Sequence, residues 1–370
     1  MPDYPKENPR TDSAPGGAQE TPQQASLDLG VIGNGSVAAL LDGRARMVWC
    51  CLPRFDADAS FCALLSPSIE GGDWAIELED FERTEQFYLL NTAVLVTRLF
   101  DHHGGAIEIT DFAPRYRSYG RLYHPEMLTR RVAPISGSPR VRIRMRPLCD
   151  YGARPAQTTS GSNHIRYLLS DVVQRLTSDV ATVLIERGLP FGLDRPAHFV
   201  FGPDETLGNN VADFVHLALE RTLDYWREWV RYLSVPYEWQ AAVIRAAITL
   251  KLCQYEDTGA IVAALTTSIP ESGGTVRNWD YRYCWLRDAA FTVRALNRLG
   301  ATRTMEEYIR FAFNLVASKD LSELGPVFGI TFESELPERQ VDTLKGYRGM
   351  GPVRVGNDAW RQRQNDVYGS

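Results

Sequence analysis

Short alternating runs of apolar and polar residues dominate the chain from about residue 27 to about residue 200. The alternation has a period of two, and Gly, Pro, Asp and Ser separate the runs, which is typical of β-strands joined by turns. The clearest runs are residues 74–78, 93–100, 106–110, 141–145 and 181–185. Many short strands separated by turns favour an antiparallel sandwich over a parallel α/β sheet. We therefore predict a β-sandwich domain over residues 26–208.

After residue 208 the apolar residues recur with the period of an α-helix instead of that of a strand. Between residues 211 and 233 the large apolar residues fall on roughly one helical face. They are Phe214, Leu217, Trp226, Trp229 and Leu233. Pro236 ends this pattern because proline cannot continue a helix. We predict a linker helix within residues 209–236.

Helical patterns continue in residues 237–370, which we predict to form an all-α domain. The predicted helices span residues 238–255, 286–299 and 304–317, with Gly300 just past the end of the second, and a last helix begins at Asn357. Helices separated by polar, aromatic loops suggest a toroid with its site at one rim. Residues 1–25 are polar and rich in Pro, Gly, Gln and Ser, and they lack the apolar segment of a secretory signal. We expect a disordered tail there.

Composition narrows the class of protein. A length of 370 residues favours two domains, and a net charge of −6 without a Lys/Arg stripe argues against nucleic acid. The arginines at alternate positions in residues 140–146 indicate the solvated face of a strand. No run of 18 apolar residues occurs, so no membrane span is expected. Six cysteines without a CxxC pair or zinc-like spacing indicate buried thiols in a reducing compartment, so we expect a cytoplasmic protein. No metal-binding residues are identified, and the sequence does not indicate whether a metal is bound.

Aromatic and charged residues are concentrated in residues 278–288, Asn-Trp-Asp-Tyr-Arg-Tyr-Cys-Trp-Leu-Arg-Asp. Aromatic rings can cover the C–H face of a pyranose, while Arg and Asp bind its hydroxyls through charge-assisted hydrogen bonds. This combination favours a sugar pocket. The alternative is a buried structural cluster at a domain junction, in which each charge has a partner.

Three ordered signatures resemble glycoside hydrolase family 15, in its bacterial and archaeal glucoamylase/trehalase-like branch. The first runs from Leu40-Leu-Asp-Gly through residues 48–56 to Gly71-Gly-Asp-Trp74, the second covers residues 258–288, and the third covers residues 344–369. The resemblance implies a β-sandwich ahead of an (α/α)6 toroid. It also implies inverting hydrolysis that releases glucose from non-reducing ends, with no cofactor.

The resemblance extends to particular side chains. The pattern Asp-Tyr-x-Tyr-x-Trp-x-Arg-Asp is also similar to fungal glucoamylases, which implies that Arg287 and Asp288 clamp the hydroxyls of the terminal glucose and that Tyr281 and Trp285 line its pocket. By the same resemblance Trp360 and Gln364 form a second wall. Trp360 has an equally good alternative as a helix-packing residue.

Inverting hydrolysis needs two carboxyl groups about 6.5–9.5 Å apart, one acting as acid and one as base. The motifs that carry them in the family are absent before Ser370, and residues 237–370 hold about four or five helices, too few for a closed toroid. The clustered Glu333, Glu335 and Glu338 offer no convincing substitute pair. We therefore expect the catalytic residues to lie beyond this chain and the chain alone to be inactive.

Several functions stay open from the sequence. The leading hypothesis is a glucoamylase-like enzyme acting on maltodextrins, and trehalase activity is its first alternative, because both need the same glucose clamp. A non-catalytic carbohydrate-binding remnant is a further alternative. A phosphorolytic enzyme would need a basic phosphate pocket, and the helical half shows no such cluster. The oligomeric state is not indicated.

Overall fold

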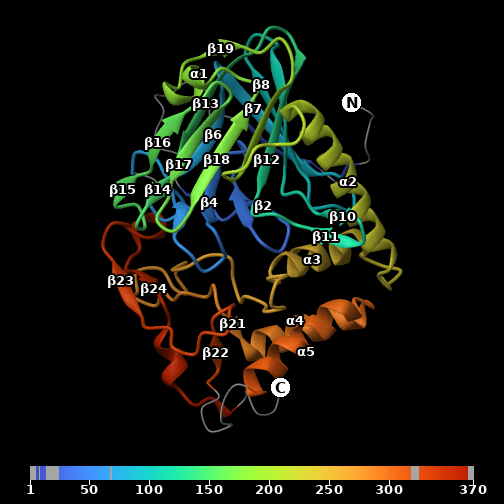
Figure 1. The fold of residues 1–370 in the computed structure, drawn as a ribbon, viewed down its shortest axis with the longest axis vertical. Helices are drawn as coiled ribbons and strands as arrows, with labels where there is room; N and C mark the ends of the chain where they lie inside the picture. Colours follow the sequence, from blue (N-terminus) through green and yellow to red (C-terminus); the bar gives the residue numbers. More distant parts are fainter. Residues whose placement is uncertain (1–5, 8, 14–24, 67–68, 318–324, 366–370) are drawn as a thin grey trace. The chain divides into compact units, whose positions relative to one another are not determined.

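The computed structural model describes residues 6–7, 9–13, 25–66, 69–317 and 325–365. The chain divides into two compact units, Met1–Arg227 and Glu228–Ser370 (Figure 1). The described residues of the first unit lie mostly in antiparallel strands, and those of the second hold three complete α-helices among irregular segments. Each unit is described separately below.

Two antiparallel sheets form the first unit. The larger has the order β1 (Arg10–Ser13), β7 (Phe81–Tyr88), β8 (Leu95–Asp101), β9 (Ala106–Phe112), β12 (Leu128–Ser136), β20 (Ala197–Pro203), β18 (Val173–Ser178), β17 (His164–Leu168) and β16 (Gln157–Ser160). The smaller has the order β19 (Phe191–Gly192), β13 (Arg140–Arg146), β6 (Asp73–Leu78), β4 (Met47–Cys51), β3 (Ala38–Leu41) and β2 (Gly30–Gly33), with β5 (Ala59–Phe61) paired to β4. Two short hairpins complete the unit, β10 (Tyr116–Ser118) with β11 (Arg121–Tyr123) and β14 (Leu148–Cys149) with β15 (Arg154–Pro155).

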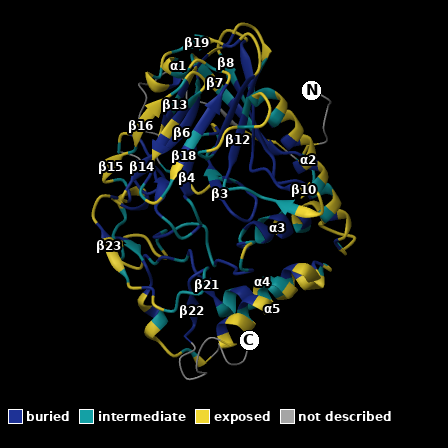
Figure 2. Cartoon of the chain, in the orientation of Figure 1, coloured by how far each residue is buried: buried dark blue, intermediate teal, exposed yellow. Residues whose placement is uncertain are grey.

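The inner faces of both sheets contribute to one hydrophobic core, so the unit is a sandwich. Trp74 of the smaller sheet is fully buried, and its ring lies 6.4 Å from the ring of Phe199 and 6.0 Å from that of Phe201, both in β20 of the larger sheet. Figure 2 shows the buried residues concentrated along these central strands, while α1, β15 and β16 carry exposed positions. The prediction of an N-terminal sandwich is confirmed.

Four of the five strands singled out in the sequence are confirmed as β6, β8, β9 and β13. The fifth prediction is wrong: residues 181–185 form most of helix α1 (Thr182–Glu186). Ile185 is buried in the sandwich core, whereas Val183 is 43% exposed. A five-residue apolar run cannot be assigned to strand or helix from its periodicity alone, and here one buried contact is enough to anchor a single helical turn.

The predicted disordered tail is wrong for part of residues 1–25. Strand β1 pairs antiparallel with β7 through Arg10–Gln86 to Ser13–Arg83, and Arg10 forms an ion pair with Asp28. Without β1, strand β7 would expose its backbone N–H and C=O groups at the sheet edge, and such groups can pair with any extended segment whatever its composition. Residues 1–5, 8 and 14–24 of the predicted tail lie outside the described residues.

The predicted linker helix is α2 (Val211–Arg231). Its apolar face packs on the outer face of the larger sheet, where Val215, Leu219 and Leu223 join a cluster with Phe112 and Val200. Arg140, Arg142 and Arg146 of β13 are exposed, as predicted, whereas Arg144 is half-buried. Arg140 forms an ion pair with Glu79. All six cysteines are free thiols, and all but Cys253 are buried.

The second unit contains α3 (Gln240–Leu252), α4 (Leu286–Arg298) and α5 (Thr302–Ala317), with α4 and α5 packed side by side (Figure 1). Gly300 follows the end of α4 with a φ of +82°, which agrees with the predicted C-terminal glycine. The helix predicted from Asn357 is the short 3-10 helix η3 (Asp358–Arg361), with Asn357 as its N-cap. Residues 366–370 lie outside the described residues.

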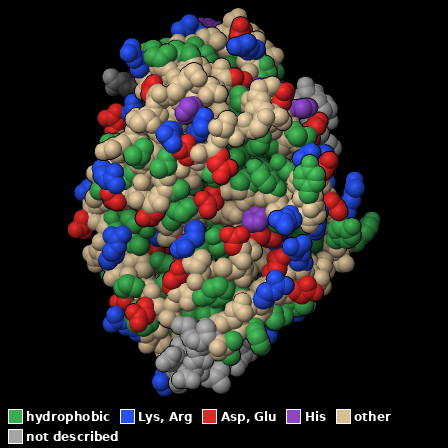
Figure 3. Space-filling model, viewed as in Figure 1, with side chains coloured by type: hydrophobic (Ala, Val, Ile, Leu, Met, Phe, Trp, Pro, Cys, Tyr) green, Lys and Arg blue, Asp and Glu red, His purple; other side chains and the backbone are tan. Residues whose placement is uncertain are grey.

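Short strands interrupt the helices of this unit, which is therefore helical but not all-α. They form two ladders, β21 (Cys284–Trp285) with β22 (Val327–Phe328) and β23 (Arg339–Val341) with β24 (Val353–Val355), beside the 3-10 turn η2 (Tyr347–Gly349). The toroid stays a prediction. No helix among the described residues is both long and apolar enough to cross a bilayer. On the face drawn in Figure 3, acidic and basic side chains are interspersed.

Candidate sugar-binding site

The aromatic motif lies on one arm of an irregular hairpin that covers residues 261–285. Backbone hydrogen bonds join Ala263 to Tyr283 (3.1 Å), Ala264 to Tyr281 (2.9 Å) and Ser268 to Trp279 (2.9 Å). A further bond, from the Glu271 N–H to the Arg277 carbonyl (3.1 Å), closes the loop at the tip. The hairpin therefore fixes the backbone on which the predicted sugar-binding side chains stand.

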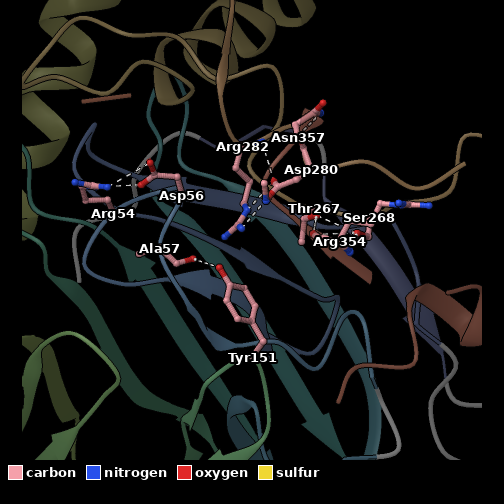
Figure 4. A network of polar contacts seen from close by, with 11 residues as sticks. Arg54, Asp56, Ala57, Tyr151, Thr267, Ser268, Asp280, Arg282, Arg354 and Asn357 are labelled. Carbon is pink, nitrogen blue, oxygen red and sulfur yellow. Dashed lines mark hydrogen bonds and ion pairs between the residues drawn. The ribbon is translucent and has the colours of Figure 1, made fainter. Parts of the chain in front are cut away.

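Asp280 and Arg282 are buried inside this hairpin and bind each other. Both side chains are fully inaccessible, and Arg282 donates through Nε to Asp280 Oδ1 (2.9 Å) and through Nη2 to Oδ2 (2.8 Å). The Gly356 N–H and the Asn357 amide also bind Asp280 (Figure 4). A bidentate, buried pair of this kind is structural. This part of the motif fits the alternative of a buried cluster.

The segment before η3 holds the hairpin in place from the other side. Thr267 donates its hydroxyl to the Arg354 carbonyl (2.6 Å), and the Asn278 amide donates to the carbonyls of Met350 (2.8 Å) and Pro352 (3.0 Å). These bonds satisfy polar groups that would otherwise be buried without partners. Figure 4 shows the Thr267, Ser268 and Arg354 part of this network.

Tyr281 and Trp285 lie together, as the resemblance implied. Their ring centroids are 6.0 Å apart with an interplanar angle of 53°. Trp285 is buried in a small apolar cluster with Tyr283, Val327 and Leu336, and Tyr281 packs against that cluster from its edge. The two rings thus form one partly exposed aromatic wall.

Arg287 and Asp288 follow this wall at the start of α4. Their side chains are 41% and 45% exposed, and Arg287 Nη2 lies 3.6 Å from Asp288 Oδ2. Asp288 occupies the first turn of the helix, where the macrodipole stabilises a carboxylate. The guanidinium of Arg287 lies 5.9 Å from the centroid of the Trp285 ring. Both groups remain open to solvent beside the aromatic wall.

Trp360 and Gln364 approach the same place from η3 and the residues after it. Trp360 packs against the cluster that contains Trp285, and Gln364 Oε1 lies 3.5 Å from Arg287 Nη1, at the outer limit of a hydrogen bond. The structure therefore brings all six predicted site residues into one region of the second unit. The indole N–H groups of Trp285 and Trp360 are buried and have no hydrogen-bond acceptor among the described residues.

Sequence reasoning missed Glu271, which binds the wall, and Arg277, which binds Glu271. Tyr281 donates its hydroxyl to Glu271 Oε1 (2.6 Å), and Arg277 donates to Oε2 of the same carboxylate through Nε (3.1 Å) and Nη2 (2.7 Å). The hydrogen bond from Tyr281, followed by the bond and charge of Arg277, lowers the pKa of Glu271. Burial raises the pKa of Tyr281, and Glu271 adds to that effect. The opposite charges of Glu271 and Arg277, on either side of Gly273-Gly274, were the sequence signal from which their ion pair could have been predicted.

The glutamates considered as substitute catalytic groups are mostly engaged elsewhere. Glu333 accepts hydrogen bonds from the backbone and side chain of Thr331, and Glu338 pairs with Arg354, whereas Glu335 is exposed. Among the residues that the structure describes, no group of three or more His, Cys, Asp or Glu side chains is arranged to hold a metal ion. The site offers aromatic faces and an exposed guanidinium–carboxylate pair, which are groups suited to binding a polyhydroxylated ring.

The chain matches two family models. Residues 239–370 match "Glycosyl hydrolases family 15", and residues 19–184 match "Trehalase-like, N-terminal". Residues 239–370 thus belong to glycosyl hydrolases family 15.

Several curated relatives carry the name trehalase. The trehalase of Thermoplasma volcanium is 31% identical over 360 residues, which cover 92% of this chain and 55% of the relative. Trehalase 1 of Sulfolobus acidocaldarius is 31% identical, covering 92% of this chain and 58% of the relative, and the trehalase of Mycobacterium tuberculosis is 28% identical, covering 93% and 54%. The chain thus spans about half the length of the curated relatives it matches.

Proposed function

We propose that the protein is a trehalase of glycosyl hydrolases family 15 and that the second unit supplies part of its glucose-binding pocket. The names of the relatives and of the N-terminal match support trehalose as the substrate. They favour the alternative drawn from the sequence over its leading hypothesis, a glucoamylase-like enzyme acting on maltodextrins. We keep the cytoplasm as the proposed location, on the cysteine usage alone.

The exposed Arg287–Asp288 pair beside the aromatic wall is the observation that carries this proposal. The two side chains are 41% and 45% exposed, and the Arg287 guanidinium lies 5.9 Å from the centroid of the Trp285 ring. Charged groups next to an aromatic face are suited to binding the hydroxyls and the C–H face of a sugar ring. Packing alone would account for the burial of Trp285 but not for an exposed ion pair next to it.

Each side chain then has a role that its chemistry permits. Arg287 and Asp288 would clamp neighbouring hydroxyls of the glucose ring, as donor and acceptor. Tyr281 and Trp285 would cover the C–H face of the ring, and Trp360 with Gln364 would close the opposite side. Fixing the ring in this way orients the anomeric carbon for attack by water, which the acid and base carboxyl groups of an inverting enzyme carry out.

Glucose release from trehalose, maltose and maltoheptaose tests the proposal in an enzyme that supplies both catalytic carboxyl groups, because this chain alone is expected to be inactive. We expect trehalose to be preferred, and Asp288→Ala to lower kcat/KM by on the order of 100-fold. Inversion would release one β-glucose and one α-glucose from each trehalose, which NMR of the first products distinguishes. Preference for maltoheptaose would favour the glucoamylase hypothesis. Sugar binding without release would favour a carbohydrate-binding remnant.

A further inference from the structure

Glu271 divides its two carboxylate oxygens between two partners. Oε2 receives both hydrogen bonds of Arg277, and Oε1 receives the Tyr281 hydroxyl at 2.6 Å. The Glu271 side chain is 32% exposed and that of Arg277 is 65% exposed. An exposed ion pair of this kind adds little to stability.

The charge of Glu271 fixes the direction of the hydrogen bond with Tyr281. An ionised carboxylate has no proton to donate, so the phenol must be the donor. The phenol proton is then held in the hydrogen bond to Glu271, so the Tyr281 oxygen can offer a ligand only its lone pairs. The low pKa of Glu271 and the raised pKa of Tyr281 both keep this arrangement near neutral pH.

The loop that carries Glu271 is built to hold this carboxylate in position. The backbone bond from Glu271 to Arg277 closes the loop, and the Thr275 hydroxyl binds the Ser272 carbonyl (2.9 Å) inside it. Gly274 adopts a φ of +73° at the turn, a conformation that other residues rarely take. Glu271 therefore stands on a closed loop, opposite the aromatic wall.

We propose that Glu271 is a positioning residue that orients the Tyr281 hydroxyl so that its oxygen accepts a hydrogen bond from one hydroxyl of the bound glucose unit. This inference rests on the proposed glucose pocket. It also sets the direction of one hydrogen bond in the site: a ligand hydroxyl must be the donor to the Tyr281 oxygen. A Gln at position 271 can donate as well as accept, so it would leave the phenol free to point its proton towards the sugar.

The experiment compares the wild-type protein with Glu271→Gln, Tyr281→Phe and the double variant, with Glu335→Gln as the control for an exposed glutamate outside the network. Isothermal titration gives the Kd for glucose, trehalose and a series of monodeoxyfluoro-glucoses. A C–F group accepts weakly and cannot donate, so it reports the direction of each hydrogen bond. The 13Cζ chemical shift of Tyr281, assigned with Tyr281→Phe, reports the phenol independently of any ligand. Thermal midpoints check that each variant is folded.

We expect Glu271→Gln and Tyr281→Phe each to raise the Kd for glucose by roughly 10-fold, with no further rise in the double variant. Fluorine at one ring position should weaken binding to the wild type by a similar factor and leave Tyr281→Phe unaffected. The Tyr281 13Cζ shift should move in Glu271→Gln and stay fixed in Glu335→Gln.

Wild-type binding that Glu271→Gln leaves unchanged would overturn the inference and leave the proposed function standing. Lost affinity with an unmoved Tyr281 shift would also overturn it, because Glu271 would then act by another route. A folded wild type that binds none of these sugars would overturn the proposed pocket itself, and the role of Glu271 with it. These failures are distinguished in one set of titrations.

Discussion

Asp280 and Arg282 stand two residues apart on one arm of a hairpin and form a bidentate ion pair that no solvent reaches. Between them, Tyr281 points the other way, towards the aromatic wall. An extended arm alternates its side chains between two faces, so one short segment both anchors the hairpin and builds the site. The two interpretations of the motif, sugar pocket and structural cluster, therefore apply to alternate residues.

Replacement of Asp280 by Asn should destabilise the second unit by about 3–5 kcal/mol, because it removes the carboxylate that binds the buried Arg282 guanidinium through two hydrogen bonds. Asp288→Asn is the matched control, since Asp288 is 45% exposed, and it should cost no more than about 1 kcal/mol of helix-dipole energy. Urea denaturation followed by tryptophan fluorescence measures both. Equal losses in the two variants would contradict the structural role assigned to Asp280.

Replacement of Arg287 by Ala should weaken binding of trehalose by about 1.5–3 kcal/mol, the usual contribution of a charge-assisted hydrogen bond. Arg287 is 41% exposed, so the unfolding free energy should change little. Isothermal titration gives the affinity, and a matched Arg363→Ala variant, also at an exposed arginine, should bind as the wild type does. An unchanged Kd in Arg287→Ala would remove this residue from the proposed clamp.

The contribution of Glu271 to stability should depend on pH. Its folded-state pKa is lower than the ordinary value of 4.5, so the stabilisation is present above pH 4.5 and is lost as the pH falls through the lower, folded-state value. The difference in unfolding free energy between wild type and Glu271→Gln should therefore be constant from pH 7 to pH 5 and shrink in more acidic solution. Urea titrations across this range provide the measurement. A difference that grows on acidification would have the wrong sign.

Two glycines with positive φ should respond differently to alanine. A Cβ at Gly356 would lie 2.0 Å from the Pro337 carbonyl oxygen, whereas a Cβ at Gly274 would meet nothing within 4 Å. We expect Gly356→Ala to cost about 2–4 kcal/mol from strain and overlap, and Gly274→Ala only about 1 kcal/mol from strain. Denaturant midpoints compare the two. Similar midpoints would show that the Gly356 backbone moves aside without penalty.

The thiols should be inert while the protein is folded. Burial raises the pKa of Cys253 to about 11 and that of Cys284 to about 12, and it raises the pKa of Cys50 as well. The thiolate is the reactive form, so at pH 8 a thiol-specific reagent should label none of these rapidly in the native state. All six cysteines should react after unfolding. Rapid labelling of Cys284 in the native protein would show that the wall region opens.

The sandwich, the helix predicted after it and the helices of the second unit could be predicted from the sequence, because in each the spacing of apolar residues repeats often enough to identify strand or helix. It failed at residues 181–185, where five residues are too few to separate strand from helix, and at residues 10–13, where backbone pairing with β7 overrides a polar composition. The site residues were found through the family motif. Glu271 was missed because no local pattern shows that its carboxylate meets Tyr281, ten residues along the chain.

The pairing of β1 with β7 also bears on how the protein is handled at high concentration. Lys6 and Glu7 extend the cover beyond β1 to the Tyr88–Leu89 end of the strand, whereas the opposite edge strand, β16, consists of exposed Gln, Thr and Ser. A protein that begins at residue 26 would uncover the β7 edge at residues 83–86 and at Tyr88–Leu89. Such an edge is a template for strand addition between molecules. Strand β1 thus protects this edge of the sheet against aggregation, and a protein that lacks it should aggregate more readily at high concentration.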